Sequence, residues 1–174
     1  MKKRTSLLLI LMLLLVLAGC GAKPAPTEPP ELTVTNAQGA SITAMGGSYD
    51  WDYEAGGGQR TGAIACGMHP LDETLRDSTP ALEMPIAVSA SFYYTVTLDF
   101  GDCAPDSVIL RYWNEQCWGD TQAKAEKLTV QRQDDGTYTV ELIPSVGIFE
   151  VDAQWDTEDY CGRAFYSFCT KAAE

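Results

Sequence analysis

One short stretch of the chain, Cys66-Gly67-Met68-His69, places a thiol, a thioether and the only imidazole of the sequence within four residues. Soft sulfur ligands with an imidazole suit Cu(I), and a thiolate with an imidazole suits Zn²⁺, so a metal- or redox-sensing site is one hypothesis. A closed metal site needs three or four ligands, however, and no Cys-x-x-Cys pair occurs in the chain. The sequence favours a small buried thiol that ends a strand before a turn at His69-Pro70.

A reactive thiol with its base is a weaker interpretation of the same stretch. Neighbours in sequence seldom face each other productively, and catalytic partners usually converge from distant segments. The chain contains no Gly-x-Ser-x-Gly, His-Glu-x-x-His or Walker pattern. Carboxylates are abundant, which leaves an envelope hydrolase with a carboxylate pair as an alternative, but abundance gives no information about pairing. We therefore predict that the protein is not an enzyme.

Aromatic side chains offer a second kind of site. Trp113 and Trp118, with Tyr112, could form a platform for a sugar or a peptide. A β-sandwich needs large core residues, so at least one of the two tryptophans should be buried. Trp118, which lies beside Gly119 in a predicted loop, is the better candidate for exposure and ligand contact.

Acidic residues gather in two places. Asp152, Asp156, Glu158 and Asp159 could hold Ca²⁺ through oxygen ligands, but they lack the spacing and the central glycine of a calcium loop. Two further aspartates flank Trp51 on what should be the outward face of a strand. Solvated charge is the favoured interpretation in both places.

The first residues of the chain predict export. A basic head, Lys2 to Arg4, precedes an apolar run that is shorter than the ~20 residues a membrane-spanning helix needs. The run ends in Leu-Ala-Gly-Cys, which resembles the lipobox of bacterial lipoproteins. By that resemblance residues 1–19 are a signal peptide, and Cys20 carries a diacylglycerol and becomes the first residue of the mature chain. The resemblance implies a protein anchored on the outer face of the cell membrane.

Residues 20–31 are predicted to be the lipidated cysteine and a linker, and residues 32–174 the folded domain. Four prolines among residues 21–31 favour an extended spacer that lifts the domain about 30 Å from the bilayer. Without the signal peptide the chain has 9 basic and 24 acidic residues, a net charge of −15. Such a surface repels phosphate backbones, which excludes nucleic acid as a partner.

Alternation of apolar residues recurs throughout the domain and predicts strands. The expected strands lie near residues 32–35, 49–54, 60–65, 92–100, 108–112, 128–130, 138–142, 149–155 and 164–168. Asp134-Asp135-Gly136 predicts a tight hairpin, because glycine accepts the positive φ of such turns. Residues 67–85 are expected to be irregular, with one helical turn near 72–76. The pattern predicts an all-β protein, an antiparallel sandwich of about seven to nine strands.

Five cysteines remain after Cys20, an odd number in a domain for which export allows disulfides. Because successive antiparallel strands reverse direction, Cys103 and Cys161 should share one end of the sandwich, and Cys117 and Cys169 the other. The pairs Cys103 with Cys161 and Cys117 with Cys169 are therefore permitted, with Cys66 left over. This connectivity is one of three that four cysteines allow.

Longer segments carry a resemblance that covers most of the chain. These are GSYDWDYEAGGG with CGMHPLD, VTLDFGDCAPDSVILRYW, GTYTVELIPS, and GIFEVDAQW followed by GRAFYSF. Together they resemble a group of uncharacterised Gram-positive envelope lipoproteins whose domain is similar to immunoglobulin-like sandwiches. Related segments occur in the extracellular parts of BlaR1-type sensor peptidases. The resemblance implies fold and location, and we expect a binding domain that contacts an envelope protein or glycan through loops at one end of the sandwich.

Overall fold

The structure is a computed structural model of the chain, which describes residues 24–85, 93–142 and 146–173. The predicted signal peptide, residues 1–19, and the predicted lipidation site, Cys20, lie outside these described residues. Neither of the two short helices in the described ranges is long and apolar enough to cross a membrane. Lipid anchoring therefore stays a prediction.

The smaller of two sheets is antiparallel throughout. Its five strands are ordered β2-β1-β6-β10-β9. They comprise β1 (Thr33–Asn36), β2 (Ser41–Thr43), β6 (Tyr94–Asp99), β9 (Gln131–Arg132) and β10 (Tyr138–Leu142). Val34, Leu98 and Tyr138 lie in register across three neighbouring strands and are buried, as the alternation predicts.

The larger sheet has seven strands, in the order β4-β3-β12-β11-β7-β8, with β5 paired to β12. Their bounds are β3 (Met45–Gly56), β4 (Gln59–Ala65), β5 (Ala81–Met84), β7 (Ser107–Asn114), β8 (Glu126–Leu128), β11 (Gly147–Asp156) and β12 (Tyr160–Ala172). β5 runs parallel to β12, which corrects the expectation of a purely antiparallel protein. β5 lies in the stretch that was predicted to be irregular. The prediction missed it because the strand has only four residues, with prolines on both sides, so the alternation of Leu82 and Met84 is too short to recognise.

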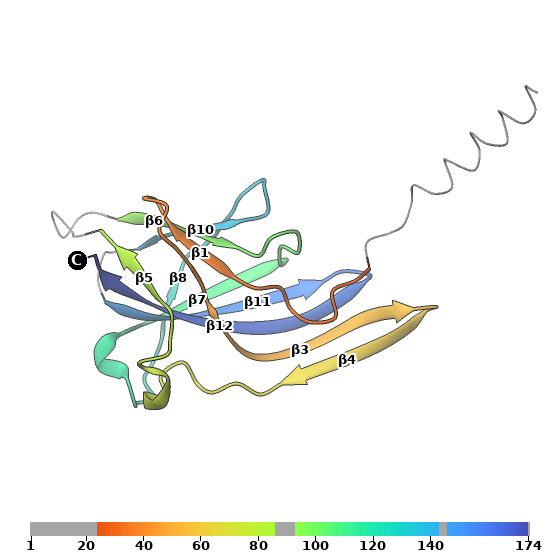
Figure 1. Cartoon of the computed structure of the whole chain (residues 1–174), viewed down its shortest axis with the longest axis horizontal. Helices are drawn as coiled ribbons and strands as arrows, with labels where there is room; N and C mark the ends of the chain where they lie inside the picture. Colours follow the sequence, from red (N-terminus) through yellow and green to blue (C-terminus); the bar gives the residue numbers. More distant parts are fainter. Residues whose placement is uncertain (1–23, 86–92, 143–145, 174) are drawn as a thin grey trace, which may run out of the picture.

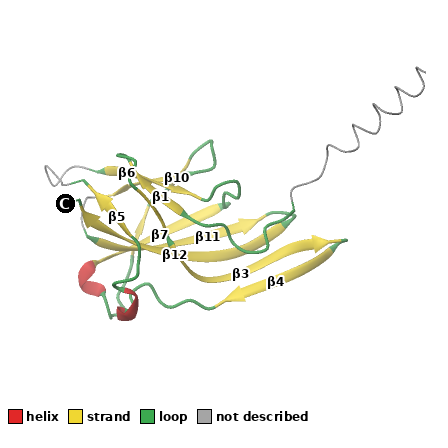
Figure 2. Cartoon of the chain, in the orientation of Figure 1, coloured by secondary structure: helices red, strands yellow, loops and turns green. Residues whose placement is uncertain are grey.

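The two sheets pack face to face around one hydrophobic core (Figures 1 and 2). Trp155 lies edge-on to both Trp51 and Phe100, with ring centroids 5.2 and 5.7 Å apart. Phe149 stacks on Phe168 at 4.9 Å. The all-β prediction is confirmed, and these residues come from the alternating segments that predicted it.

Local signals set the turns. The predicted hairpin at Asp134-Asp135-Gly136 joins β9 to β10, and Gly136 adopts a φ of 89°. The predicted helical turn is η1 (Glu73–Leu75), which begins after Asp72 because that side chain accepts a hydrogen bond from the Thr74 amide. A second 3-10 turn, η2 (Glu115–Cys117), follows β7.

A second, smaller hydrophobic cluster covers the outer face of the larger sheet. Leu71, Trp113 and Ile148 are its buried members. Trp113 Nε1–H donates to the Ala123 carbonyl at 3.0 Å, so the loop after η2 closes over the ring. The two helical turns, η1 and η2, lie near each other at one end of the molecule (Figure 2). Trp113 is therefore buried as predicted, but on the outside of the sheet.

Residues 24–31 pack against the domain, which corrects the prediction of an extended spacer. The Pro26 carbonyl accepts a hydrogen bond from Trp51 Nε1–H at 2.8 Å, and the Pro30 carbonyl accepts one from the Tyr166 hydroxyl at 2.7 Å. Leu32, directly after this segment, is fully buried. The segment thus closes one end of the core, and Trp51 is only 1% exposed.

Candidate functional site

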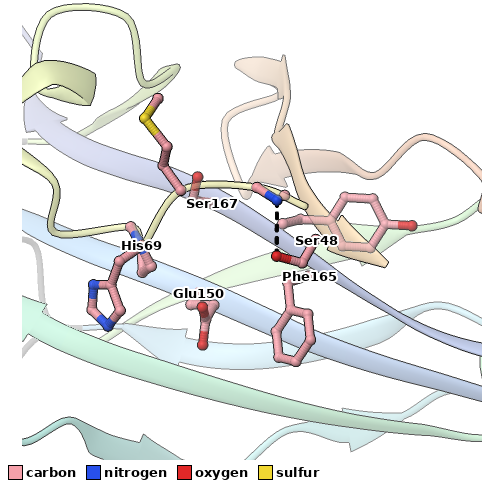
Figure 3. A pocket seen from close by; sticks show the side chains of 10 residues that line it. Ser48, His69, Glu150, Phe165 and Ser167 are labelled. Carbon is pink, nitrogen blue, oxygen red and sulfur yellow. Dashed lines mark hydrogen bonds between the residues drawn. The ribbon is translucent and has the colours of Figure 1, made fainter. Parts of the chain in front are cut away.

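A cavity of about 270 Å³ opens on the outer face of the larger sheet. Strands β11 and β12 supply Glu150, Phe165 and Ser167, and the segment after β4 supplies Met68 and His69. In Figure 3 the His69 ring lies on one side of Glu150 and Phe165 on the other. The remaining lining residues are Gly47, Ser48, Gly67, Pro70 and Tyr166.

Gly67 fixes the segment that forms one wall of this cavity. A Cβ at this position would lie 2.5 Å from the Ser48 backbone nitrogen, so only glycine permits the close approach to β3. The Gly67 N–H also donates to Ser48 Oγ at 3.0 Å, drawn as the dashed line in Figure 3. Cys66, the preceding residue, is exposed and lines no part of the cavity. The prediction of a buried thiol at this position is wrong, because Cys66 directly follows β4, an edge strand whose residues are mostly exposed.

His69 is held in one orientation. Its Nδ1 accepts a hydrogen bond from the Leu71 N–H at 3.1 Å, and its carbonyl accepts one from the Asp72 N–H, which confirms the predicted turn. The ring stands edge-on to Trp113, with centroids 6.0 Å apart. Because Nδ1 accepts, the neutral imidazole carries its proton on Nε2. His69 thus offers its Nε2–H as a hydrogen-bond donor.

Glu150 is held by an ion network that continues along the outer face of the sheet. Arg111 donates to Glu150 at 2.6 Å and to Asp152 at 2.7 Å, and Arg163 makes two hydrogen bonds of 2.6 Å to Asp152. Asp152 is only 4% exposed. Burial favours the neutral form of Asp152, but the hydrogen bonds from Arg163 and Arg111 outweigh it, so the pKa of Asp152 is lowered. The network therefore keeps Asp152 ionised and Glu150 in a fixed position.

Asp152 does not belong to the acidic cluster expected from the sequence. It faces Arg111 and Arg163 in the middle of β11, whereas Asp156, Glu158 and Asp159 are exposed at the end of the strand and in the following turn. Solvated charge is thus wrong for Asp152. Periodicity does not mark Arg111 and Arg163, although Glu150 and Asp152 lie at alternate positions of one strand and so share a face to which basic side chains can pair.

Two of the three residues named in the metal hypothesis lie at the cavity. Met68 and His69 both line the cavity, but Met68 is 57% exposed and its sulfur accepts a contact from the Thr74 hydroxyl at 3.9 Å. Across residues 24–85, 93–142 and 146–173, no group of three or more His, Cys, Asp or Glu side chains is placed to hold a metal ion. Cys66 is exposed and lies outside the cavity lining, and the metal hypothesis for Cys66, Met68 and His69 stays a prediction.

Glu150 and Asp152 lie at alternate positions of β11 on the outer face, and both accept hydrogen bonds from Arg111. The pKa of Asp152 is lowered, which is the opposite of what the general acid of a carboxylate pair needs. The absence of catalytic activity stays a prediction.

The two tryptophans proposed as ligand contacts belong to one cluster. Trp113 is 5% exposed, and Trp118 is half-buried and packs against the same cluster. The Gly119 N–H donates to the Leu71 carbonyl, which ties the loop of Trp118 down onto the turn after His69. These residues therefore support the wall of the cavity and do not form an open aromatic platform.

The structure contains neither predicted disulfide among its described cysteines. Cys103 lies beside inward-facing Tyr160, whose pKa is raised by burial and by the Cys103 thiol, whereas Cys161 accepts a hydrogen bond from Arg60. Successive residues of a strand point to opposite faces, so Cys103 and Cys161 share an end but are separated by the sheet. This is why that pair does not form here.

Cys117 and Cys169 each pack against the outer cluster. Burial raises the pKa of the Cys169 thiol to about 11, so it is protonated and unreactive at neutral pH. Both thiols are free in this structure, and a bond between them stays a prediction.

Comparison with protein-family models, with curated proteins and with solved structures found no significant match. The resemblance to envelope lipoproteins therefore stays a prediction.

Proposed function

We propose that the chain is a lipid-anchored extracellular binding protein without catalytic activity, built on an immunoglobulin-like β-sandwich. In this proposal the cavity beside His69 and Glu150 holds one neutral hydroxylated ring, such as a sugar unit of an envelope glycan. The lipobox at Cys20 supports the location, and the two facing sheets support the fold.

The observation that carries the binding role is a donor and an acceptor held beside each other in one cavity. The Leu71 amide sets His69 Nε2–H as a donor, and Arg111 holds the Glu150 carboxylate as an acceptor. Neither group has to reorganise when a ligand arrives, which lowers the entropic cost of binding. A sugar hydroxyl both donates and accepts, so it satisfies both groups at once.

Size and charge favour a single uncharged ring. The volume of about 270 Å³ lies just below the range of about 300–1,000 Å³ that drug-sized ligands occupy. Arg111 balances the charge of Glu150, and the other polar side chains at the cavity are the hydroxyls of Ser48 and Ser167. Phe165 adds an aromatic surface of the kind against which sugar rings pack.

The test is the affinity of the mature chain for neutral oligosaccharides released from cell-wall glycan, measured by titration calorimetry. Glu150→Gln removes a charge-assisted hydrogen bond worth at least about 1.4 kcal/mol, so Kd should rise about tenfold or more. His69→Asn keeps an acceptor for the Leu71 amide but removes the Nε2–H donor, and it should weaken binding similarly. Glu158→Gln, at an exposed residue of the β11–β12 turn, is the matched control and should leave Kd unchanged.

Two results would refute this proposal. One is the absence of binding by the folded mature chain, and the other is an equal loss of affinity in the Glu158→Gln control. Thermal unfolding of each variant separates a lost contact from a lost fold.

A further inference from the structure

Residues 24–31 fix the point at which the chain leaves the domain. Trp51, which donates to the Pro26 carbonyl, lies in register with Gly162, just after the turn between β11 and β12. Figure 1 shows the first described residues beside that turn and at the opposite end from the C terminus. The chain therefore enters at the end that carries the β11–β12 turn, and the hydrogen bonds of Pro26 and Pro30 hold it there.

Five residues separate Cys20 from Pro26, whose carbonyl is held by Trp51. Their full extension places Cys20 no more than about 22 Å from Pro26, which is shorter than the 30 Å expected for a free spacer. We propose that the end of the domain with the β11–β12 turn faces the lipid surface at this short distance. This inference rests on the proposed function, because it requires the lipid at Cys20.

The tether, and not attraction to headgroups, holds this end near the bilayer. The Asp156 backbone N–H donates to the Asp106 carboxylate, and Gly136 lies close to Ala104. The loops at 101–106 and 134–136 and the β11–β12 turn therefore meet at this end. Their exposed acidic residues are Asp102, Asp106, Asp134, Asp135, Asp156, Glu158 and Asp159. Anionic lipids repel such a surface over a Debye length of about 8 Å. The loops at this end are thus unsuited to the partner contact expected from the sequence.

The same geometry places the cavity away from the lipid. Glu150 lies five residues along β11 from Trp155, which is about 17 Å at the rise of a strand. Trp155 belongs to the bilayer-facing end, because its Nε1–H donates to the Cys103 carbonyl of the loop there. The cavity is therefore held at the height of envelope material outside the headgroups.

The experiment uses the full lipidated mature chain in phosphatidylcholine nanodiscs that contain a lipid with a gadolinium-chelate headgroup. Amide NMR signals near the bilayer lose intensity through paramagnetic relaxation. Asp135 and Asp159 should lose several-fold more intensity than Thr74 and Gln116, which lie in the helical turns. Equal losses, or the reverse order, would overturn the proposal while leaving the anchor intact. A chain that does not purify with the discs would instead refute the anchor itself.

A variant of the tether makes the test sharper. A Gly/Ser insertion of about twelve residues between Lys23 and Pro24 adds a root-mean-square reach of about 20 Å. The difference in intensity loss between the two ends should then fall strongly. The same insertion after Glu174 is the matched control and should change nothing. A difference that survives the Lys23 insertion would show that something other than the short tether orients the domain.

Discussion

Two irregular segments each cover a tryptophan of the larger sheet and accept its indole N–H on a backbone carbonyl. The N-terminal segment, residues 24–31, covers Trp51 and accepts its Nε1–H on the Pro26 carbonyl. The loop after η2 covers Trp113 and accepts its Nε1–H on the Ala123 carbonyl. The first closure borders the aromatic core between the sheets, whereas the second borders the polar cavity and the Arg111 network.

The two tryptophans have different surroundings. Beneath the N-terminal segment, Trp51 stacks on Tyr160 at 5.3 Å and serves the core. Beside the outer cluster, Trp113 supports His69, and β11 presents Glu150 and Asp152 with fixed partners. The N-terminal segment thus closes the core at one end of the sheet, and the outer face carries His69 and Glu150, the groups of the proposed binding site.

The largest expected effect tests which closure supports the core. Trp51→Ala removes a ring that contacts Trp155 and Tyr160 and should lower the free energy of unfolding by about 3–5 kcal/mol. Trp113→Ala should cost less, because its small cluster can collapse onto the sheet. Urea unfolding measures both values. A larger loss in Trp113→Ala would invert the comparison.

A smaller effect is expected from the ion network. Asp152→Asn leaves Arg111 and Arg163 without a charged partner. Removing one partner of a buried pair costs about 3–5 kcal/mol, but Arg163 is half-exposed, so a loss of about 1–3 kcal/mol is expected. Asp156→Asn, at an exposed position of the same strand, should change the free energy of unfolding by less than about 0.5 kcal/mol.

The stabilisation from Asp152 should depend on pH. The pKa of Asp152 is lower in the folded chain than its ordinary value of about 3.9. Its contribution to stability is therefore complete well above pH 4 and is lost as the pH falls through and below that value. The stability difference between the native chain and Asp152→Asn should shrink from pH 6 to pH 3. A constant difference over that range, measured by urea unfolding, would show that the Asp152 charge does not stabilise the fold.

Gly67→Ala should have the smallest effect on stability, but it should clearly change the wall of the cavity. Gly67→Ala places a methyl group 2.5 Å from the Ser48 nitrogen, so the segment carrying His69 must move away from β3. A cost of about 1–2 kcal/mol is expected, with a shifted NMR signal for the His69 ring. Gly46→Ala is the control, because a Cβ there meets no atom within 4 Å. An unchanged His69 signal in Gly67→Ala would show that Gly67 does not set the wall.

Periodicity made most of the fold predictable from the sequence. Strands β6, β10, β11 and β12 fall on the expected segments because alternate residues face the core over several positions. β5 escaped prediction because it is short and pairs with a strand far away in the sequence. Proline composition predicted an extended backbone at residues 24–31, but it could not show that the Pro26 and Pro30 carbonyls meet donors.

The candidate site was less predictable, because it depends on which strands are neighbours. Arg111, Asp152 and Arg163 come from three strands, and their pairing follows only from the order β7-β11-β12. The stretch around His69 was recognised in the sequence, but its partners were not. Glu150 joins His69 at the cavity through the fold and not through any motif.

The most direct test of the binding role is an NMR titration of the isotopically labelled mature chain with a neutral cell-wall oligosaccharide. We expect the amide signals of Gly67, Leu71 and Ser167 to shift together, because they report on the cavity wall, the His69 hydrogen bond and the β12 floor. Shifts confined to the loops at 101–106 and 134–136, or no shifts at saturating ligand, would contradict the binding role.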